Sequence, residues 1–148
     1  MAWNNDGHGM VIKAAEVKLF KPSHSWGMKL SQLPRQAGRV RIMTYSLPDR
    51  SYIIEQFNRR PNNIAILCHA KFRERAIELK ALFPDIDVAV SESVHAKLLL
   101  IEPGTIYVTS ANFGESHWSE VGVGIRSEAG HKWYAEMFDD LWKKSEVI

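Results

Sequence analysis

The chain of 148 residues contains a single cysteine, Cys68, so no disulfide can form within it. Because Cys68 lies in an apolar run, we expect a buried thiol. No segment is long and apolar enough to cross a bilayer. Residues 1–9 are polar and glycine-rich, without the apolar centre of a secretion signal. These absences predict a cytoplasmic protein with no membrane partner.

The sequence also lacks a cluster of metal ligands, since Cys68 and His69 are neighbours without partners at ligand spacing. No linker, repeat or low-complexity stretch divides the chain. We therefore expect residues 1–148 to form one domain, with 1–15 as a flexible N-terminal segment. The formal net charge is only +2, but arginines are concentrated in the first half. Most of them are expected on solvated helix faces, and the others are available to contact phosphates.

Apolar periodicity predicts strands that alternate with helices. Strands are expected at 16–20, 40–46, 63–68, 86–90 and 121–126, and helices at 24–36, 48–59, 71–83 and 133–142. The last helix carries an apolar stripe and should face the core. Alternating elements followed by a run of strands indicate the α/β class, with a mixed β-sheet flanked by helices.

The most informative feature is His95-Ala96-Lys97 followed by Ser110-Ala111-Asn112. Between these segments, two apolar and partly β-branched stretches flank Pro103-Gly104, which predicts a hairpin. The motif thus brings an imidazole, an ammonium, a hydroxyl and an amide to the open end of one hairpin.

The expected register depends on the length of the turn. If only Pro103-Gly104 forms it, Lys97 lies opposite Ser110 and His95 lies opposite Asn112. The four side chains would then share one face and could contact a single phosphate. A Pro-Gly turn is not the favoured tight hairpin turn, so a longer loop stays open.

This pattern resembles the phospholipase D superfamily, whose signature is His-x-Lys, four residues, Asp and then Gly-Ser-x-Asn. Here Glu102 stands in place of the Asp and Thr109 in place of the Gly. The strand at 40–46, the downstream Glu120 and the last helix are similar to small single-motif bacterial endonucleases. The resemblance covers residues 40–145. A second His-x-Lys at His69 has no Ser-x-Asn at the right distance and is interpreted as a structural or rim group.

The residue chemistry suits cleavage of a phosphodiester without a metal or cofactor. A neutral His95 can attack phosphorus, and Lys97 can stabilise the developing charge. Ser110 and Asn112 can form hydrogen bonds with the non-bridging oxygens. The resemblance gives Glu120 the role of orienting His95. The candidate substrate-binding residues are Thr109, His117 and Arg41. For His117, a surface loop without function is the alternative.

Enzymes of this superfamily carry two copies of the motif, whereas this chain carries one complete copy. The resemblance therefore implies a twofold homodimer in which His95 of each subunit meets its copy in one composite site. Nucleic acid is the expected substrate, with DNA favoured over RNA. A phospholipid phosphodiesterase or phosphatidyl transferase and a non-catalytic nucleic-acid-binding module remain as alternatives. A purely structural role for His95 and Lys97 also stays open.

Overall fold

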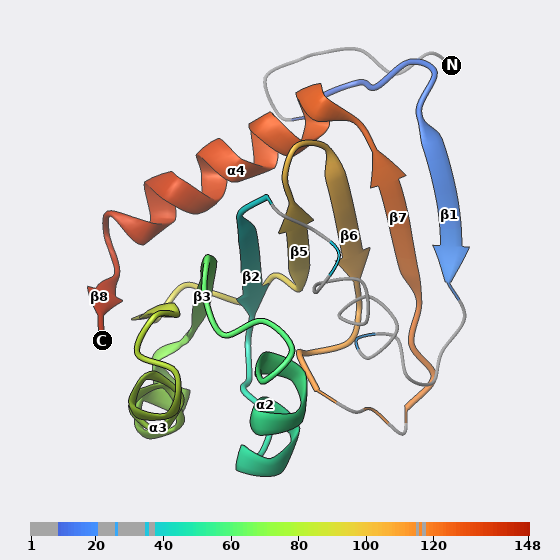
Figure 1. Cartoon of the computed structure of the whole chain (residues 1–148). Coiled ribbons are helices and arrows are strands. Elements are labelled where there is room, and N and C mark those ends of the chain that lie inside the picture. Colours follow the sequence, from blue (N-terminus) through green and yellow to red (C-terminus); the bar gives the residue numbers. More distant parts are fainter. Residues whose placement is uncertain (1–8, 21–25, 27–34, 36–37, 115, 117) are drawn as a thin grey trace.

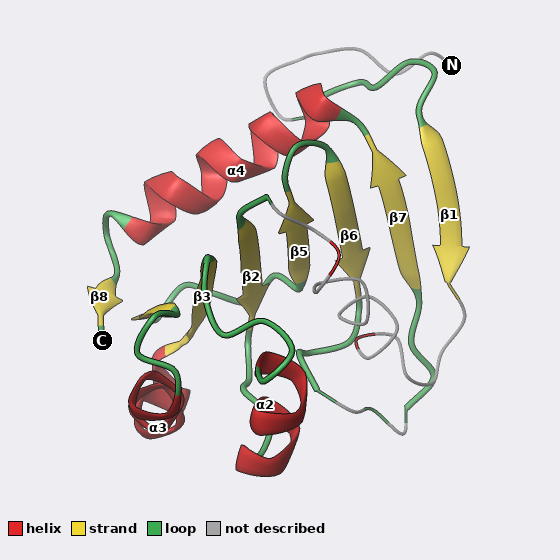
Figure 2. Cartoon of the chain, in the orientation of Figure 1, coloured by secondary structure: helices red, strands yellow, loops and turns green. Residues whose placement is uncertain are grey.

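The computed structural model describes residues 9–20, 26, 35, 38–114, 116 and 118–148. Within these residues the chain forms an eight-stranded mixed sheet flanked by helices, so the predicted α/β architecture is confirmed (Figures 1 and 2). The elements are β1 (Glu16–Phe20), β2 (Val40–Thr44), α2 (Arg50–Phe57), β3 (Ile64–His69), the 3-10 helix η2 (Ala70–Phe72), α3 (Arg73–Leu82), β4 (Asp87–Ser91), β5 (Leu98–Ile101), β6 (Thr105–Thr109), β7 (Gly122–Arg126), α4 (Glu128–Trp142) and β8 (Glu146–Val147).

The strand order is β1-β7-β6-β5-β2-β3-β4-β8. The β2–β3 and β3–β4 pairs are parallel, and α2 and α3 make the crossovers that parallel neighbours need. The other neighbouring strands pair in the antiparallel direction. Consequently the C-terminal ends of β2, β3 and β6 and the N-terminal end of β5 lie at the same end of the sheet. We call this end of the strands the motif edge. It lies opposite the hairpin turn between β5 and β6 (Figure 1).

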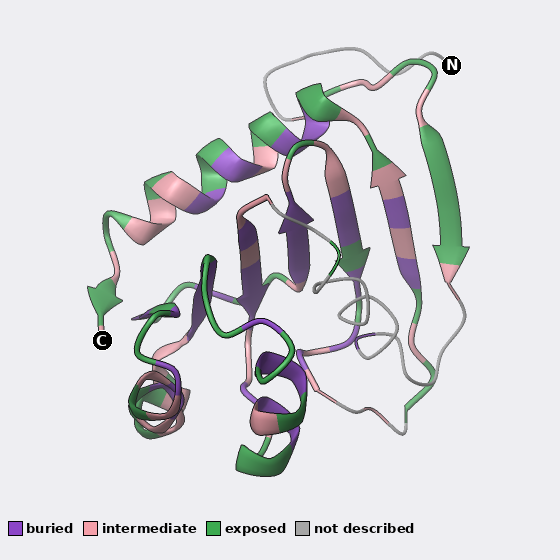
Figure 3. Cartoon of the chain, in the orientation of Figure 1, coloured by how far each residue is buried: buried purple, intermediate pink, exposed green. Residues whose placement is uncertain are grey.

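Two apolar layers hold the sheet between its helices. Ile42 and Ile66 pack in the layer with α2 and α3, whereas Met43 and Leu67 pack in the layer under α4. Successive residues of a strand point to opposite faces, so β2 and β3 must be apolar on both. The central strands are buried, while β1 is largely exposed (Figure 3). This rigid centre fixes where the strand ends lie at the motif edge.

Local capping decides where the helices begin. The Asp49 carboxylate accepts the Tyr52 N–H at 2.9 Å, and α2 then ends at Phe57, two residues before the predicted end. Ser127 accepts the Gly130 N–H at 3.0 Å, so α4 begins earlier than the predicted residue 133.

Several predictions fall partly or wholly outside the described residues. The expected helix at 24–36 is such a case, because only residues 26 and 35 of it are described. Of the expected flexible segment, 9–15 contains no helix or strand, and 1–8 lies outside the described residues. The short strand β8, which the sequence pattern did not indicate, pairs with β4 at the edge of the sheet.

The hairpin turn is longer than the two-residue turn predicted above. Ile101 pairs with Thr105, so the loop contains residues 102–104 and the register differs from the prediction by one residue. The reason lies outside the hairpin. The Glu102 N–H donates to the Arg39 carbonyl oxygen at 3.1 Å, which extends the β5–β2 ladder and withdraws Glu102 from pairing with Thr105.

The thiol of Cys68 is buried in β3, as expected, and burial raises its pKa to about 12. A thiol in this state is not a nucleophile at neutral pH. Among the helices of the described residues, none combines the length and apolar character that a membrane span requires.

Candidate active site

His95 and Lys97 lie at the motif edge, immediately before β5. The Lys97 ammonium donates to the main-chain oxygen of His95 at 2.8 Å, and its Nζ lies 3.3 Å from His95 Nδ1. An ammonium can only donate, so Nδ1 is the acceptor and a neutral imidazole carries its proton on Nε2. The imidazole is exposed to solvent. The two groups with the strongest expected affinity for phosphate are therefore in contact with each other.

An aromatic cluster supports His95 from the end of β2. The Tyr45 ring lies 5.3 Å from the His95 ring, 4.7 Å from the His69 ring and 5.7 Å from the Phe72 ring, measured between centroids. The His69 N–H also donates to the Tyr45 carbonyl oxygen at 3.1 Å. Tyr45 thus joins the second His-x-Lys segment to the motif histidine. Tyr45 was not among the predicted site residues, although its position directly after β2 places it at the strand ends.

His69 has a defined orientation within this cluster. Its Nδ1 accepts the Lys71 N–H at 3.1 Å, so a neutral His69 carries its proton on Nε2. That nitrogen lies 3.8 Å from a carboxylate oxygen of Glu92. Because Glu92 precedes His95 by three residues, this pairing links β3 to the segment that carries the motif histidine.

The observed register separates Lys97 from Ser110. The Thr109 N–H donates to the Lys97 carbonyl oxygen at 3.2 Å, so Lys97 lies opposite Thr109. Ser110, one residue further, projects to the other face of the sheet. The predicted pairing of Lys97 with Ser110 is therefore wrong, and the proposed single face does not include Ser110.

Ser110 instead holds the downstream acid. Its hydroxyl donates a short hydrogen bond to the Glu120 carboxylate and accepts the Val121 N–H at 2.9 Å. Ser116 donates to the other Glu120 oxygen at 3.1 Å. Among the described residues, no hydrogen bond joins Glu120 to His95. Two serines thus fix the Glu120 carboxylate at the motif edge. The pairing of β6 with β7 brings Ser110 and Glu120 together.

Asn112 follows β6 in a loop whose backbone is anchored on both sides. The Phe113 N–H donates to the Thr44 hydroxyl at 2.9 Å, and the Trp26 indole donates to the Ala111 carbonyl oxygen at 3.0 Å. The side-chain oxygen of Asn112 is buried, and none of the described residues forms a hydrogen bond with it. A buried polar atom without a partner is unusual in a native protein and often marks a functional position.

A pocket of about 570 Å³ opens beside Asn112. It lies between the β2–α2 loop, the first turns of α2 and the loop that follows β6. Its polar and aromatic lining includes Asp49, Glu55, Asn112, Trp118 and Glu120. Two predicted site residues, Asn112 and Glu120, therefore face a common space.

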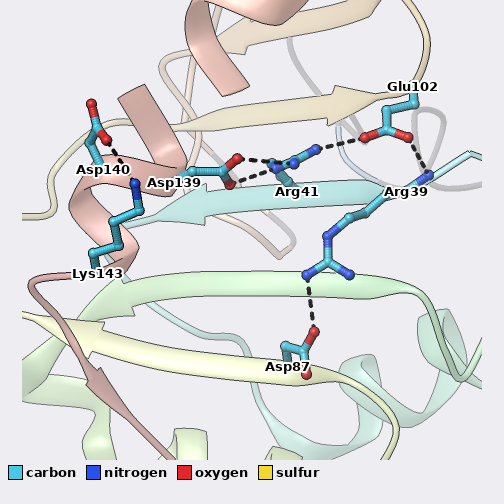
Figure 4. Close-up of polar contacts among 7 residues, drawn as sticks. All are labelled: Arg39, Arg41, Asp87, Glu102, Asp139, Asp140 and Lys143. Carbon is cyan, nitrogen blue, oxygen red and sulfur yellow. Dashed lines mark hydrogen bonds and ion pairs between the residues drawn. The ribbon is translucent and has the colours of Figure 1, made fainter. Parts of the chain in front are cut away.

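Arg41 lies within β2 and Glu102 at the β5–β6 turn, and Figure 4 shows the ion pairs that they form. The Arg41 guanidinium binds Asp139 and Glu102 at 3.0 Å each, and its side chain is only 12% exposed. Burial opposes the charge of Arg41, but the hydrogen bonds with Asp139 and Glu102 outweigh burial and raise its pKa. Arg39 and Asp87 extend these ion pairs along the sheet. Arg41 is thus not brought to the candidate site, and Glu102 has a structural role at the hairpin turn.

Two further predicted substrate-binding residues have different outcomes. Thr109 is buried, and its hydroxyl donates to the Val121 carbonyl oxygen at 3.2 Å while accepting the Ala111 N–H at 3.1 Å. Its hydrogen-bonding capacity is used within the fold. His117 lies outside the described residues. Within the described part of the chain, no group of three or more His, Cys, Asp or Glu side chains is placed to hold a metal ion.

The sheet order, the two helical layers and the motif edge define a phospholipase D-like fold, and the resemblance predicted from the motif is confirmed at this level. Nuc from Salmonella typhimurium, described as a phospholipase D family member, is 18% identical, with a TM-score of 0.72 over 90% of this chain and 99% of that chain. NucT from Helicobacter pylori is 13% identical, with a TM-score of 0.69 over 90% of this chain and 100% of that chain.

A third similar structure has a different description. TrmBL2, an archaeal chromatin protein described as showing a novel mode of DNA binding, is 14% identical with a TM-score of 0.66. The similarity covers 100% of this chain and 57% of TrmBL2. No protein-family profile and no curated protein matches the sequence. At these identities the similarity establishes the fold alone, because activity depends on the residues of the site.

Proposed function

We propose that this protein is a metal-independent phosphodiesterase that cleaves nucleic acid, with DNA favoured over RNA, through a phosphohistidine intermediate on His95. The observation that carries the proposal is the contact between His95 and Lys97 at the motif edge of a phospholipase D-like fold. An imidazole can attack phosphorus, and a neighbouring ammonium can neutralise the charge that develops on the phosphoryl oxygens.

Substrate binding would rearrange this contact. A phosphate is a better acceptor for the Lys97 ammonium than a neutral imidazole nitrogen, because the hydrogen bond then joins two charged groups. Once Lys97 turns to the phosphate, His95 Nδ1 is free to carry the proton and Nε2 can present its lone pair. In this proposal Glu120, held by Ser110 and Ser116, accepts the Nδ1 proton as a hydrogen bond in the assembled site.

The reaction then takes two steps. The Nε2 lone pair forms a bond to phosphorus while the bond from phosphorus to the leaving oxygen breaks, and an acid protonates that oxygen. Water afterwards cleaves the phosphorus–nitrogen bond and restores His95. Asn112 is proposed to donate to a non-bridging oxygen through its amide nitrogen. Ser110 acts by holding Glu120, since its hydroxyl already donates to that carboxylate.

A second His95, from the partner in a twofold homodimer, is the proposed acid. In-line displacement requires the acid and the nucleophile on opposite sides of phosphorus, and one hairpin supplies one of them. An exposed apolar row supports self-association beside the site. Leu19 pairs with Val123, which pairs with Val108, so the three side chains share one face. Leu19 is 78% exposed, and an uncovered apolar row of this kind suits an interface.

A non-catalytic nucleic-acid-binding module is the second candidate, and two observations favour it. A chromatin protein described as binding DNA has a similar fold over the whole of this chain. In addition, Lys97 holds His95 Nδ1 in the free protein, which leaves no lone pair on Nε2 for attack. In this case the motif would bind the phosphate of a nucleic acid without cleaving the phosphodiester.

Turnover of bis(p-nitrophenyl) phosphate in EDTA tests the proposal. Wild-type protein should release p-nitrophenol, and His95→Asn should lose this activity while keeping its thermal unfolding midpoint. His131→Asn, on α4 away from the motif edge, is the matched control and should retain activity. A wild-type protein that binds DNA but releases no p-nitrophenol would favour the binding module. Activity that EDTA abolishes and a divalent ion restores would contradict the mechanism.

A further inference from the structure

The pocket beside Asn112 differs chemically from the surface around Lys97. Among the described residues, its lining includes the Asp49, Glu55 and Glu120 carboxylates, the Asn112 amide and the Trp118 indole, and no lysine or arginine. Trp118 is 81% exposed, which is unusual for a side chain of this size. This lining offers a phosphate no positive charge from the described residues. It favours a flat, uncharged group that has N–H donors at its edge.

Part of the carboxylate lining is oriented by the fold. One oxygen of Asp49 accepts the Tyr52 N–H and the Ser51 hydroxyl, and these hydrogen bonds lower the pKa of Asp49. Glu120, which also lines the pocket, is held by Ser110 and Ser116. The pocket thus places hydrogen-bonded carboxylate oxygens of Asp49 and Glu120 near an exposed aromatic ring.

We propose that this pocket binds one unpaired nucleobase of the substrate, next to the scissile phosphate, with the base stacked on Trp118. The Asp49 and Glu55 carboxylates accept hydrogen bonds from the amino or imino N–H groups of the base edge. The inference rests on the proposed function, because Asn112 and Glu120 belong to both the phosphate site and the pocket. It names single-stranded nucleic acid as the substrate class, since the faces and edges of duplex bases are already stacked and paired.

Binding of short oligonucleotides tests this subsite directly. The protein is the full chain carrying His95→Asn, which prevents cleavage, and the probes are a single-stranded tetranucleotide and an abasic sugar–phosphate chain of equal length. Base stacking on an aromatic side chain contributes about 1–3 kcal/mol, so Trp118→Ala should weaken tetranucleotide binding by about five-fold or more. Trp118→Phe should retain most of the affinity. Trp133→Ala, which removes an exposed tryptophan from α4, should leave it unchanged.

The abasic chain separates stacking from a loss of structure. Its binding should be weak, and Trp118→Ala should not weaken it further. Equal losses for both probes, or no loss for the tetranucleotide, would overturn the inference. In the His95-containing protein, Trp118→Ala should reduce the preference for single-stranded over double-stranded DNA. If wild type hydrolyses bis(p-nitrophenyl) phosphate but Trp118→Ala keeps the wild-type preference for single-stranded DNA, the base subsite fails alone. If it hydrolyses nothing, the proposed function fails.

Discussion

The Lys97 ammonium lies 3.3 Å from His95 Nδ1 and 2.8 Å from the His95 main-chain oxygen, so the two motif residues bind each other in the free protein. This contact satisfies the ammonium in the absence of substrate. It also holds the imidazole in the form that carries its proton on Nε2. A phosphate that draws Lys97 away would release Nδ1 and prepare Nε2 for attack.

Replacing Lys97 should damage catalysis more than binding. Lys97→Met removes a cation that acts on the transition state, and kcat should fall by about 10²–10³-fold. Lys71→Met, in the second His-x-Lys segment, is the matched control and should change kcat by much less. Steady-state kinetics on bis(p-nitrophenyl) phosphate measures both variants. Equal effects at the two lysines would remove the special role of Lys97.

The same contact makes a spectroscopic prediction. In wild-type protein without substrate, the nitrogen chemical shifts of neutral His95 should report a proton on Nε2, and saturating inorganic phosphate should shift the population toward Nδ1. In Lys97→Met the free protein should have a smaller Nε2 preference. A spectrum that does not respond to phosphate would contradict the proposed release of Nδ1.

Tyr45 is expected to position His95 through its ring. Tyr45→Phe keeps the ring contacts at 5.3 Å with His95 and 4.7 Å with His69, so activity should be retained. Tyr45→Ala removes the support, and a misplacement of about 1 Å can cost about 10²-fold in rate. We expect a fall in kcat with a smaller change in KM. Tyr134→Ala, on α4, is the control. Equal losses for Phe and Ala at position 45 would indicate that the hydroxyl, and not the ring, matters.

The Arg41 ion pairs should support stability and not catalysis. Arg41→Met leaves Glu102 and Asp139 without their shared cation, and the free energy of unfolding should fall by about 1–3 kcal/mol. The kcat of the folded variant should remain close to that of wild type. Urea unfolding and turnover assays check the two statements. A selective loss of activity with unchanged stability would instead indicate that Arg41 binds the substrate.

Glu102 gives this network a pH dependence. Burial opposes its negative charge, but the hydrogen bond from Arg41 outweighs burial and lowers the pKa of Glu102 below its ordinary value of 4.5. Its stabilising contribution is therefore fully present above about pH 4.5 and is lost as the pH falls through the lower folded-state value. The destabilisation caused by Glu102→Gln should be larger at pH 7 than at pH 3. An equal effect at both pH values would contradict this assignment.

Much of the fold follows from local sequence patterns. The apolar run within 63–68 and the stripe at 133–142 predict a buried strand and a core-facing helix, and β3 and α4 are present there. The register of the hairpin could not be predicted in the same way. It depends on the hydrogen bond from the Glu102 N–H to the carbonyl oxygen of Arg39. These two residues are 63 positions apart in the sequence. A turn motif contains no information about such a partner.

In the candidate site, too, local contacts could be predicted from the sequence and long-range contacts could not. The spacing of His95 and Lys97 predicts that their side chains lie together, and the two are in contact. The aromatic support from Tyr45 and the pairing of Ser110 with Glu120 arise where strand ends meet, so no short motif encodes them. The basic charge of Arg41 suggests phosphate binding. In the structure, Arg41 instead pairs with acidic residues of the hairpin turn and of α4, which are distant in sequence.

Subunit mixing tests the central claim, that one phosphodiesterase site is built from His95 of two subunits. Wild-type and His95→Asn chains with different affinity tags are co-expressed, and the mixed dimer is purified by both tags. Its only site would contain one histidine, which cannot serve as nucleophile and acid together, so nearly all activity should be lost. The wild-type dimer should show a bell-shaped pH dependence that belongs to the coupled pair. Retention of about half the wild-type activity by the mixed dimer would show that each subunit works alone and would contradict the composite site.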